Sequence, residues 1–284
     1  MLTALSIVFS SLVSALVITA EQDTAWDGTI AEKYESGAGN ETDPYIIKTA
    51  GQLARLINDT DTAGKYYKLS NDITVNEKLT DSALPWYSVA VENGTDAVKG
   101  AVFAGHFDGN GHTVSGLYFK GNATDNTYWY AAGLFPRADA DAVIENVGVK
   151  NSSFTVTGGG QAGAIVGVYS PKSSSAEKFL TIKNCFADTS VSLSCANAGG
   201  IAGALNGAAY VYDCYFTGSL SGDTVGAVYV SGWSETVHIY RFYSTSGLQK
   251  HNNEYYEENS VYTTVQSAGN TISLADITGN AASG

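Results

Sequence analysis

Charged residues are scarce in this chain of 284 residues. They make up 15% of it, against roughly 25% in an average globular protein. Proline (4) and methionine (1) are also rare, whereas glycine (31) and tyrosine (18) are abundant. Small, β-branched and aromatic residues favour strands over helices. The composition therefore predicts an all-β fold.

Basic residues are the scarcer of the two charged classes. There are 15 of them against 28 acidic residues, which gives a net charge of −13. A chain this acidic repels phosphate backbones and anionic lipid surfaces. We therefore expect no nucleic-acid partner and no membrane contact beyond an export signal. Solubility is the simpler interpretation of the acidic excess.

Cysteine is limited to three residues, Cys185, Cys195 and Cys214. An exported protein that depends on disulfides usually has an even, spaced set of cysteines. Three cannot all pair with one another, so we expect a fold that does not depend on them.

The N-terminal segment is uncharged as far as Glu21. About 20 apolar residues are enough to cross a bilayer, but the small residues near Ala20 suit a signal-peptide cleavage site. The missing positive n-region is attributed to a start codon assigned too late. We interpret residues 1–20 as a signal peptide, with a retained anchor as the second interpretation, and residues 21–40 as a flexible mature N-terminus.

An internal repeat dominates the rest of the sequence. Four segments align without gaps: AVIENVGVKNS from Ala142, LTIKNCFADTS from Leu180, YVYDCYFTGSL from Tyr210 and VHIYRFYSTSG from Val237. The columns of this alignment are Ile144/Ile182/Val211/Ile239, Asn146/Asn184/Asp213/Arg241, Val147/Cys185/Cys214/Phe242, Val149/Ala187/Phe216 and Val191/Leu220/Leu248. A second, glycine-led set between these segments aligns Leu134, Ile165, Ile201 and Val228.

Strand-only repeats of roughly 30 residues are too short to fold alone, so neighbours must stack and cover one another's apolar edges. Equivalent residues then lie about 4.8 Å apart on successive coils. A propeller blade needs about 40 residues and four strands, which these repeats lack. We therefore predict a parallel β-helix over residues 41–248, followed by an irregular last coil or tail at 249–284.

The Asn column has a structural interpretation. Two residues separate Ile144 from Val147, so both point inward only if the chain bends between them. Asn tolerates the left-handed conformation that such a bend needs. We predict that Asn146, Asn184 and Asp213 form a ladder from coil to coil. Asp213 and Arg241, as vertical neighbours, would form an ion pair.

Cys185 and Cys214 share a column with Val147 and Phe242, which marks them as small buried hydrophobes. Their backbones are close enough for a disulfide, but side chains on in-register strands point in parallel. We predict free thiols.

A short helix is expected at the N-terminal end, where a β-helix needs a cover for its open strand edges. Thr49 and Gln52 fit a capping box, and Leu53, Leu56 and Ile57 fall on one helix face. A strand is expected before the helix at residues 45–47 and another after Gly64.

The stretch FDGNGHTVSGLYF begins at Phe107 and places Asp108, Asn110 and Gly111 close together. Compared with a calcium loop of the EF-hand type, it has Thr113 in place of the required glycine and Phe119 in place of the bidentate glutamate. Asn-Gly is a strong turn signal. We predict a structural turn, as a hairpin or a corner, and no metal or other cofactor.

Several motifs occur in a fixed order: GAGNETDPYII from Gly37, QLARLIND, YYKLSNDI, FAGHFDGNGHTVSGLY from Phe103, and then the repeats. In this order they resemble exported bacterial proteins of the GLUG-motif repeat family, over roughly residues 37–248. The resemblance implies a right-handed parallel β-helix with a pectate-lyase-like architecture. It also implies a secreted or cell-surface location and a role in adhesion, matrix or polysaccharide-related settings. The repeats depart from the family pattern at Pro136, Val230 and Arg241.

Catalytic motifs are not found in the sequence. Neither H-E-x-x-H nor G-x-S-x-G occurs, and arginine is limited to Arg55, Arg137 and Arg241. We name no catalytic residue, but a polysaccharide lyase or glycoside hydrolase of the β-helix type remains the alternative function.

Binding is the function that the sequence favours. Outward columns are aromatic, with Phe186, Tyr215 and Tyr243 in one and Tyr212 and Tyr240 in another, and the stretch Tyr128–Tyr130 adds Trp129. Rows of rings stack on sugar faces or form protein interfaces, although ordinary stacking between strands also explains them. The expected partner is a polysaccharide or a surface protein of a host or neighbouring cell. Binding residues are predicted at Tyr212, Tyr215, Tyr240, Tyr243 and Trp129.

Overall fold

The fold is nearly all β-strand. The computed structural model describes residues 26–92, 98–99, 101–122, 128–171, 178–188, 190–230, 237–244 and 261–262. In these parts of the chain α1 (Ala50–Asn58) is the one helix, and no helix is long and apolar enough to cross a membrane. The predicted signal peptide and most of the predicted tail lie outside the described residues.

Strands far apart in the sequence form five sheets, numbered here in the order in which one coil passes through them. The first sheet contains β1 (Tyr45–Ile47), β2 (Tyr66–Leu69), β6 (His106–Asp108), β11 (Val143–Glu145), β16 (Leu180–Lys183), β21 (Ala209–Tyr212) and β25 (Val237–Tyr240). The second contains β3 (Ile73–Thr74), β7 (Thr113–Ser115), β12 (Gly148–Lys150), β17 (Phe186–Ala187), β22 (Tyr215–Phe216), β26 (Phe242–Ser244) and β27 (Val261–Tyr262).

The third sheet contains β8 (Tyr118–Asn122), β13 (Ser152–Thr157), β18 (Val191–Ser194) and β23 (Ser219–Ser221). The fourth contains β5 (Val98–Lys99), β4 (Ser88–Glu92), β9 (Tyr128–Ala132), β14 (Gly160–Gly163), β19 (Asn197–Gly199) and β24 (Thr224–Gly226). The fifth contains β10 (Phe135–Ala138), β15 (Val166–Tyr169) and β20 (Ala202–Leu205).

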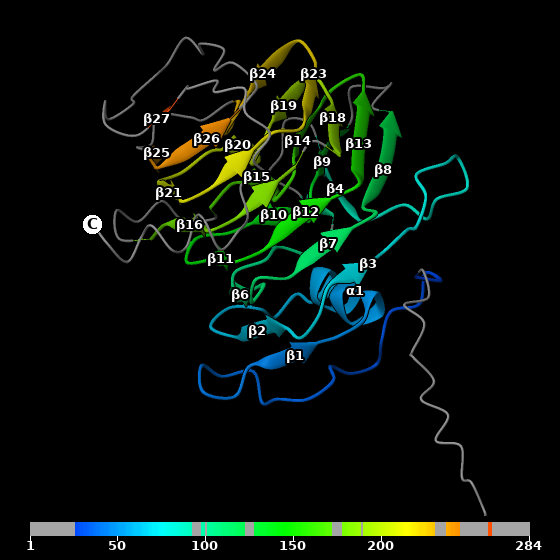
Figure 1. The fold of residues 1–284 in the computed structure, drawn as a ribbon, viewed down its shortest axis with the longest axis vertical. Helices are drawn as coiled ribbons and strands as arrows, with labels where there is room; N and C mark the ends of the chain where they lie inside the picture. Colours follow the sequence, from blue (N-terminus) through cyan, green and yellow to red (C-terminus); the bar gives the residue numbers. More distant parts are fainter. Residues whose placement is uncertain are drawn as a thin grey trace, which may run out of the picture.

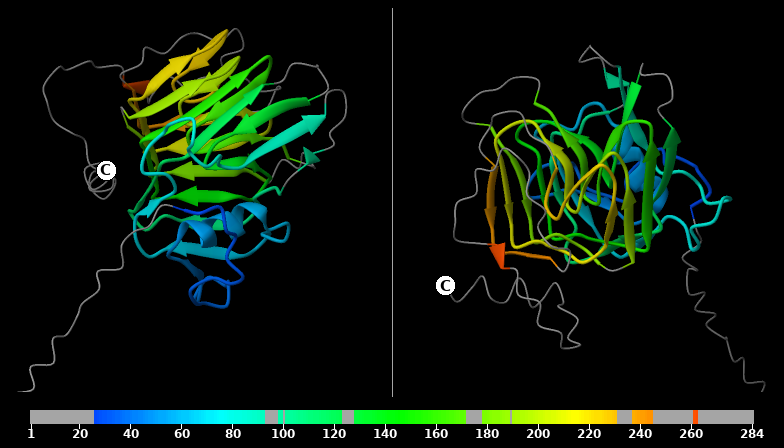
Figure 2. Two further views of the ribbon diagram at one scale, coloured as in Figure 1. Left: turned by 90° about the vertical axis from the view of Figure 1, so that its right-hand side faces the viewer. Right: turned by 90° about the horizontal axis from the view of Figure 1, so that it is seen from above.

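Apart from β4 and β5, the strands pair in parallel with their counterparts one coil away. In the first sheet Ile144 pairs with Ile182, Ile182 with Val211 and Val211 with Ile239, as the repeat alignment predicts. Figure 1 shows the coils stacked one above another, and Figure 2 shows the strands surrounding a common core when the stack is seen from above. The predicted all-β fold of parallel sheets with one short helix is confirmed, and the parallel pairing is compatible with a β-helix.

One predicted column is wrong. Leu220 pairs with Leu193 and not with Val191. Leu193 comes six positions after Ala187, whereas Leu220 comes four positions after Phe216, its partner in the second sheet. The corner between the second and third sheets is therefore two residues shorter in the later coil. Leu248, the third member of that column, lies outside the described residues.

Glycines at the corner between the fourth and fifth sheets allow adjacent backbones to approach closely. A Cβ atom on Gly199 would lie 1.8 Å from the carbonyl oxygen of Ala202, and one on Gly163 would lie 2.3 Å from that of Val166. Because no side chain fits there, each repeat begins its apolar strand with glycine.

Helix α1 covers the N-terminal end of the coils (Figure 1). Its capping box is present, with Thr49 accepting from the backbone N–H of Gln52 and Gln52 accepting from that of Thr49. Leu53, Leu56 and Ile57 are buried against the core. The outer edge of β1 is also covered, since Ser36 and Ile46 form an antiparallel bridge.

One antiparallel element interrupts the parallel pattern. Strand β4 runs antiparallel to β9, with Val91 opposite Trp129, and β5 runs antiparallel to β4. This addition to the fourth sheet was not predicted from the sequence, because β4 and β5 lie before the first aligned repeat.

Candidate binding face

The outer face of the first sheet carries three of the predicted site residues, Asp108, Tyr212 and Tyr240. Along each strand, alternate residues point into the core and the residues between them point outward. Inward residues such as Phe107, Ile144 and Ile182 are fully buried. The outward residues are half-buried: Tyr66, Lys68, His106, Asp108, Val143, Glu145, Thr181, Lys183, Tyr210, Tyr212, His238 and Tyr240.

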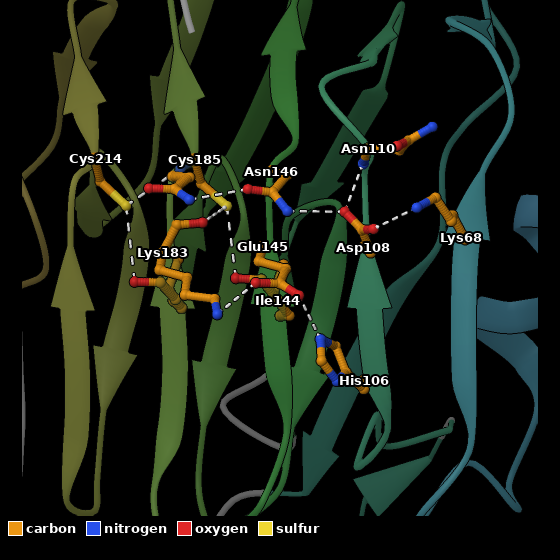
Figure 3. Close-up of polar contacts among 12 residues, drawn as sticks. Lys68, His106, Asp108, Asn110, Ile144, Glu145, Asn146, Lys183, Cys185 and Cys214 are labelled. Carbon is orange, nitrogen blue, oxygen red and sulfur yellow. Dashed lines mark hydrogen bonds and ion pairs between the residues drawn. The ribbon is translucent and has the colours of Figure 1, made fainter. Parts of the chain in front are cut away.

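Charged side chains pair from coil to coil on the N-terminal half of this face (Figure 3). Lys68 Nζ lies 3.1 Å from Asp108 Oδ2 on the next coil. Glu145 is held from both sides, with His106 Nε2 at 2.6 Å and Lys183 Nζ at 2.6 Å from its two carboxylate oxygens. The row Lys68, Asp108, Glu145 and Lys183 runs straight across four strands in register. We call it, with His106, the charge ladder.

The pKa of Glu145 is lowered to about 2 within this ladder. Desolvation by partial burial raises it, but hydrogen bonds from His106 and Lys183, together with the charges of these two residues, outweigh that effect. Glu145 is therefore a carboxylate at neutral pH that already has two donors. A general acid needs a raised pKa instead, so this carboxylate suits coil stabilisation better than proton donation.

The predicted Asn ladder lies beside the charge ladder. Asn184 Nδ2 donates to Asn146 Oδ1 at 2.9 Å, and Asn146 Nδ2 donates to Asp108 Oδ1 at 2.9 Å (Figure 3). Asn146, Asn184 and Asp213 have φ values of 56°, 52° and 55°, which is the left-handed conformation that the bend requires.

Asp213 belongs to the same column, but its side chain pairs with a residue of the following coil and not of the preceding one. Its carboxylate is buried and accepts from Arg241 Nε and, at 2.6 Å, from Arg241 Nη2. The ion pair suggested by the repeat alignment is thus present. Arg241 also has a positive φ, 47°, so the bend persists at a position where the sequence departs from Asn.

The Asp108–Gly111 turn is a corner and not a hairpin. Strand β6 belongs to the first sheet and β7 to the second, and each pairs with neighbouring coils instead of with the other. Asn110 and Gly111 have φ values of 54° and 81°, and the Asn110 N–H donates to Asp108 Oδ1 at 2.7 Å. Asp108 therefore joins the corner to the charge ladder and to Asn146.

Aromatic side chains occupy the C-terminal half of the outer face. The rings of Tyr210 and His238 stack with centroids 4.7 Å apart, and His238 and Tyr240 are parallel with centroids 6.1 Å apart. Tyr212 and Tyr240 are register partners, as predicted. We call Tyr210, Tyr212, His238 and Tyr240 the aromatic group.

The second predicted aromatic column is less exposed than expected. Phe186 and Tyr215 stack at 4.8 Å with their planes 6° apart, and each is only 4–6% exposed. Burial raises the pKa of Tyr215 to about 12. Since the stacked faces contact each other, these rings offer no platform to a ligand, and the expectation of an exposed column is wrong for both. Tyr243, the register partner of Tyr215, is half-buried.

Two other predictions concern Trp129 and the cysteines. Trp129 lies in β9, but its side chain is outside the described residues. Cys185, Cys195 and Cys214 are free and buried. The backbone N–H of Cys185 points at the Cys214 sulfur, 3.4 Å away, which places the two cysteines on adjacent coils as the alignment predicts.

The charge ladder was not predicted from the sequence, and neither were two members of the aromatic group, Tyr210 and His238. A signal for the ladder was present, because HFD at 106–108 lies one coil before VIE at 143–145 and pairs with it in register. The alignment began at Ala142 and so left the earlier coil out. Among the described residues no group of three or more His, Cys, Asp and Glu side chains is arranged to hold a metal ion.

No family model matches the chain. Halomucin from Haloquadratum walsbyi is 31% identical over 148 residues, which are 51% of this chain and 2% of halomucin. A “Putative Gly-rich membrane protein” from Evansella cellulosilytica is 29% identical over 134 residues, 47% of this chain and 14% of that protein. The chain therefore matches only a small part of the length of either relative.

Among solved structures, a “putative immunoglobulin A1 protease” from Bacteroides ovatus aligns with 80% of this chain and 85% of its own. The TM-score is 0.38 and the identity 17%. This likeness is too distant to support a statement about function.

Proposed function

We propose that the chain is a non-catalytic β-helix module of a secreted or cell-surface protein. In this proposal it belongs with the GLUG-motif repeat proteins that its sequence resembles. The coils form a rigid stalk, and the outer face of the first sheet binds a polysaccharide or a surface protein, with the aromatic group as the contact.

The observation that carries the proposal is the pairing of carboxylates on the outer face of the first sheet and at the bend beside it. Asp108, Glu145 and Asp213 each contact a cation on an adjacent coil. Each such contact ties one coil to the next, which is what a stalk requires. Hydrolysis of a glycosidic bond by two carboxylates requires a general acid and a second carboxylate on either side of the bond, and these three are instead engaged along the stack.

The aromatic group supports a binding role. Tyr212 and Tyr240 are half-buried, so each ring keeps one part anchored and one part in contact with solvent. Tyrosine combines an apolar ring with a hydroxyl and loses little conformational entropy on binding, which suits recognition of sugars and proteins. Pairing by register keeps the two side chains adjacent.

The comparisons support the location and the modular character. One relative is named as a membrane protein, and the chain matches 2% and 14% of the two relatives' lengths. A unit that recurs as a small part of long proteins suits a stalk or binding module. Export is also what the uncharged segment before Glu21 predicts.

The test combines location and binding. The full chain is followed by antibody labelling of intact cells, and the purified chain is applied to a polysaccharide array and to surface-protein extracts. We expect surface or medium location and binding that the double variant Tyr212→Ala/Tyr240→Ala reduces at least tenfold. Tyr118→Ala, a half-buried tyrosine on the third sheet, is the matched control and should bind as the wild type does.

Three results would contradict the proposal. A chain found only inside the cell would contradict the proposed secreted or cell-surface location. Equal binding by wild type and double variant would remove the aromatic group as the contact. Release of reducing ends or unsaturated products from any array polysaccharide would show an enzyme.

A further inference from the structure

Four of the five N-x-[ST] sequences have asparagines in the described residues, and all four asparagines are exposed: Asn40, Asn58, Asn122 and Asn151. Asn93 lies outside the described residues. Asparagine in this motif is the acceptor for N-linked glycans in exported proteins. From the sequence alone these motifs are as simply explained by Asn- and Thr-rich turns. The local geometry separates Asn40 from Asn58 and Asn122.

Asn40 lies in a tight turn in which its side chain is fixed by three donors. Its Oδ1 accepts from the Thr42 N–H at 3.1 Å, from the Thr42 hydroxyl at 2.9 Å and from the Asp43 N–H at 2.9 Å. Since two of the donors are backbone N–H groups, the oxygen and nitrogen of the amide are assigned unambiguously. Within the described residues Nδ2 therefore remains unbonded, on an exposed residue.

The threonine of this motif is placed on the same amide. Thr42 is exposed, and its hydroxyl contacts the Asn40 carboxamide directly. By contrast, Asn58 at the end of α1 donates its Nδ2 to Ala54 O at 2.7 Å, so its nitrogen is engaged. Asn122 Oδ1 accepts from Thr157 on the next coil at 2.9 Å and is thereby tied to β13.

The turn is closed mainly by neighbouring residues, and one further hydrogen bond, from the Tyr66 N–H to Gly39 O at 3.0 Å, joins it to β2. Ala38 and Gly39 donate their N–H groups to Asp43 O at 3.0 Å and 2.9 Å, and Gly37 and Gly39 supply φ values of 95° and 79°. Closing a loop of a few residues costs little chain entropy and is fast. The turn can therefore form during export, before the coils have stacked.

We propose that Asn40 is an N-glycosylation site, an inference that rests on the export part of the proposed function. The co-substrate is an oligosaccharide linked through phosphate to a lipid. Asn40 Nδ2 attacks C1 of the first sugar, the N–C1 bond forms, the C1–O bond to phosphate breaks, and the lipid phosphate leaves. Nδ2 loses one proton to a base of the transferase, and no electrons are exchanged with an external oxidant.

The three donors on Oδ1 assist this step. As Nδ2 loses its proton, negative charge develops on the amide oxygen. Hydrogen-bond donors that already point at such an oxygen stabilise the charge without rearrangement. The Thr42 hydroxyl is one of these donors, so in this turn the hydroxyl of the motif stabilises the developing charge.

The experiment is mass spectrometry of the full chain purified from the cells that export it. The tryptic peptide Tyr34–Lys48 contains Asn40 as its single asparagine, and the peptide Leu56–Lys65 contains Asn58. We expect a glycan on the first peptide, conversion of Asn40 to aspartate by a glycoamidase, and an unmodified second peptide. Thr42→Val should abolish the modification, and the matched Thr42→Ser, which keeps the hydroxyl, should retain it.

Outcomes separate the two proposals. An exported chain whose Tyr34–Lys48 peptide is unmodified overturns the glycosylation site and leaves the proposed function standing. A chain that is not exported overturns both. A glycan on Asn58 as well as Asn40, or one that survives in Thr42→Val, overturns the selection of Asn40 by its turn. Far-ultraviolet circular dichroism of Thr42→Val checks that the variant folds.

Discussion

Asn184 donates a hydrogen bond to the side chain of Asn146 one coil away, at 2.9 Å, and both residues have positive φ. The ladder and the bend are thus two separate contributions of one residue type. Asparagine tolerates the left-handed conformation because its short side chain bonds locally.

Substitution of Asn184 separates these contributions. Asn184→Gly removes the hydrogen bond but has no Cβ, so we expect a loss of about 1 kcal/mol. Asn184→Ala loses the same hydrogen bond and keeps a Cβ at this positive φ without the amide that makes asparagine tolerant of it, which costs about 1–2 kcal/mol relative to glycine. The free energy of unfolding in urea should rank wild type above Gly and Gly above Ala. Equal losses of unfolding free energy for the two variants would show that the left-handed conformation at residue 184 does not affect stability.

Gly148→Ala is expected to destabilise the chain through the aromatic stack. A Cβ on Gly148 would lie 2.1 Å from Phe186 Cζ, and the Phe186 ring is held against Tyr215. Overpacking of this kind costs about 1–3 kcal/mol. In a Phe186→Leu background the same substitution should cost much less, so a double-mutant cycle in urea measures the coupling. Additive effects would show that the ring moves aside freely.

The stacking of the repeats could be predicted because each aligned apolar position of the repeat keeps the same type of residue. Ile144, Ile182 and Val211 are apolar, hold the same place in their aligned segments and are fully buried, and burial of such residues is the main driving force of the stack. The N-terminal helix was also predictable, since Thr49 and Gln52 form a local motif that needs no tertiary information.

Other features depended on information that the columns do not contain. Leu220 pairs with Leu193 because the corner between the second and third sheets is two residues shorter in the later coil. The pattern of apolar residues does not report the length of a corner, so this shift could not be predicted. The charge ladder joins Lys68 to Asp108 and Glu145 to Lys183, residues of ordinary surface type whose contacts exist only once the register is known. The burial of Phe186 and Tyr215 follows from their mutual stacking, which outward orientation alone does not predict.

Acid should weaken the fold through Glu145. Its folded pKa of about 2 lies below the ordinary value of 4.5, so the unfolded chain takes up the proton first as pH falls. The contribution is present above pH 4.5 and is lost as the pH falls through about 2, with a size on the order of 3 kcal/mol. Urea unfolding at a series of pH values measures it.

Glu145→Gln provides the comparison for that measurement. The difference in the free energy of unfolding between wild type and this variant should be largest above pH 4.5 and shrink toward pH 2. Glu77→Gln, at an exposed residue, is the control and should follow the wild-type curve. A wild-type minus Glu145→Gln difference that does not change with pH would contradict the ion pairs of His106 and Lys183 with this carboxylate.

The cysteines should be unreactive in the folded chain and fully reactive in the unfolded one. Cys185, Cys195 and Cys214 are at most 3% exposed, and burial raises the pKa of Cys195 to about 11 and that of Cys214 well above its ordinary value. Alkylation requires an accessible thiolate. With iodoacetamide at neutral pH we expect no labelling of the native chain and labelling of all three cysteines in urea without reductant. Protection of Cys185 and Cys214 together in urea would show that the two adjacent coils are joined by a disulfide.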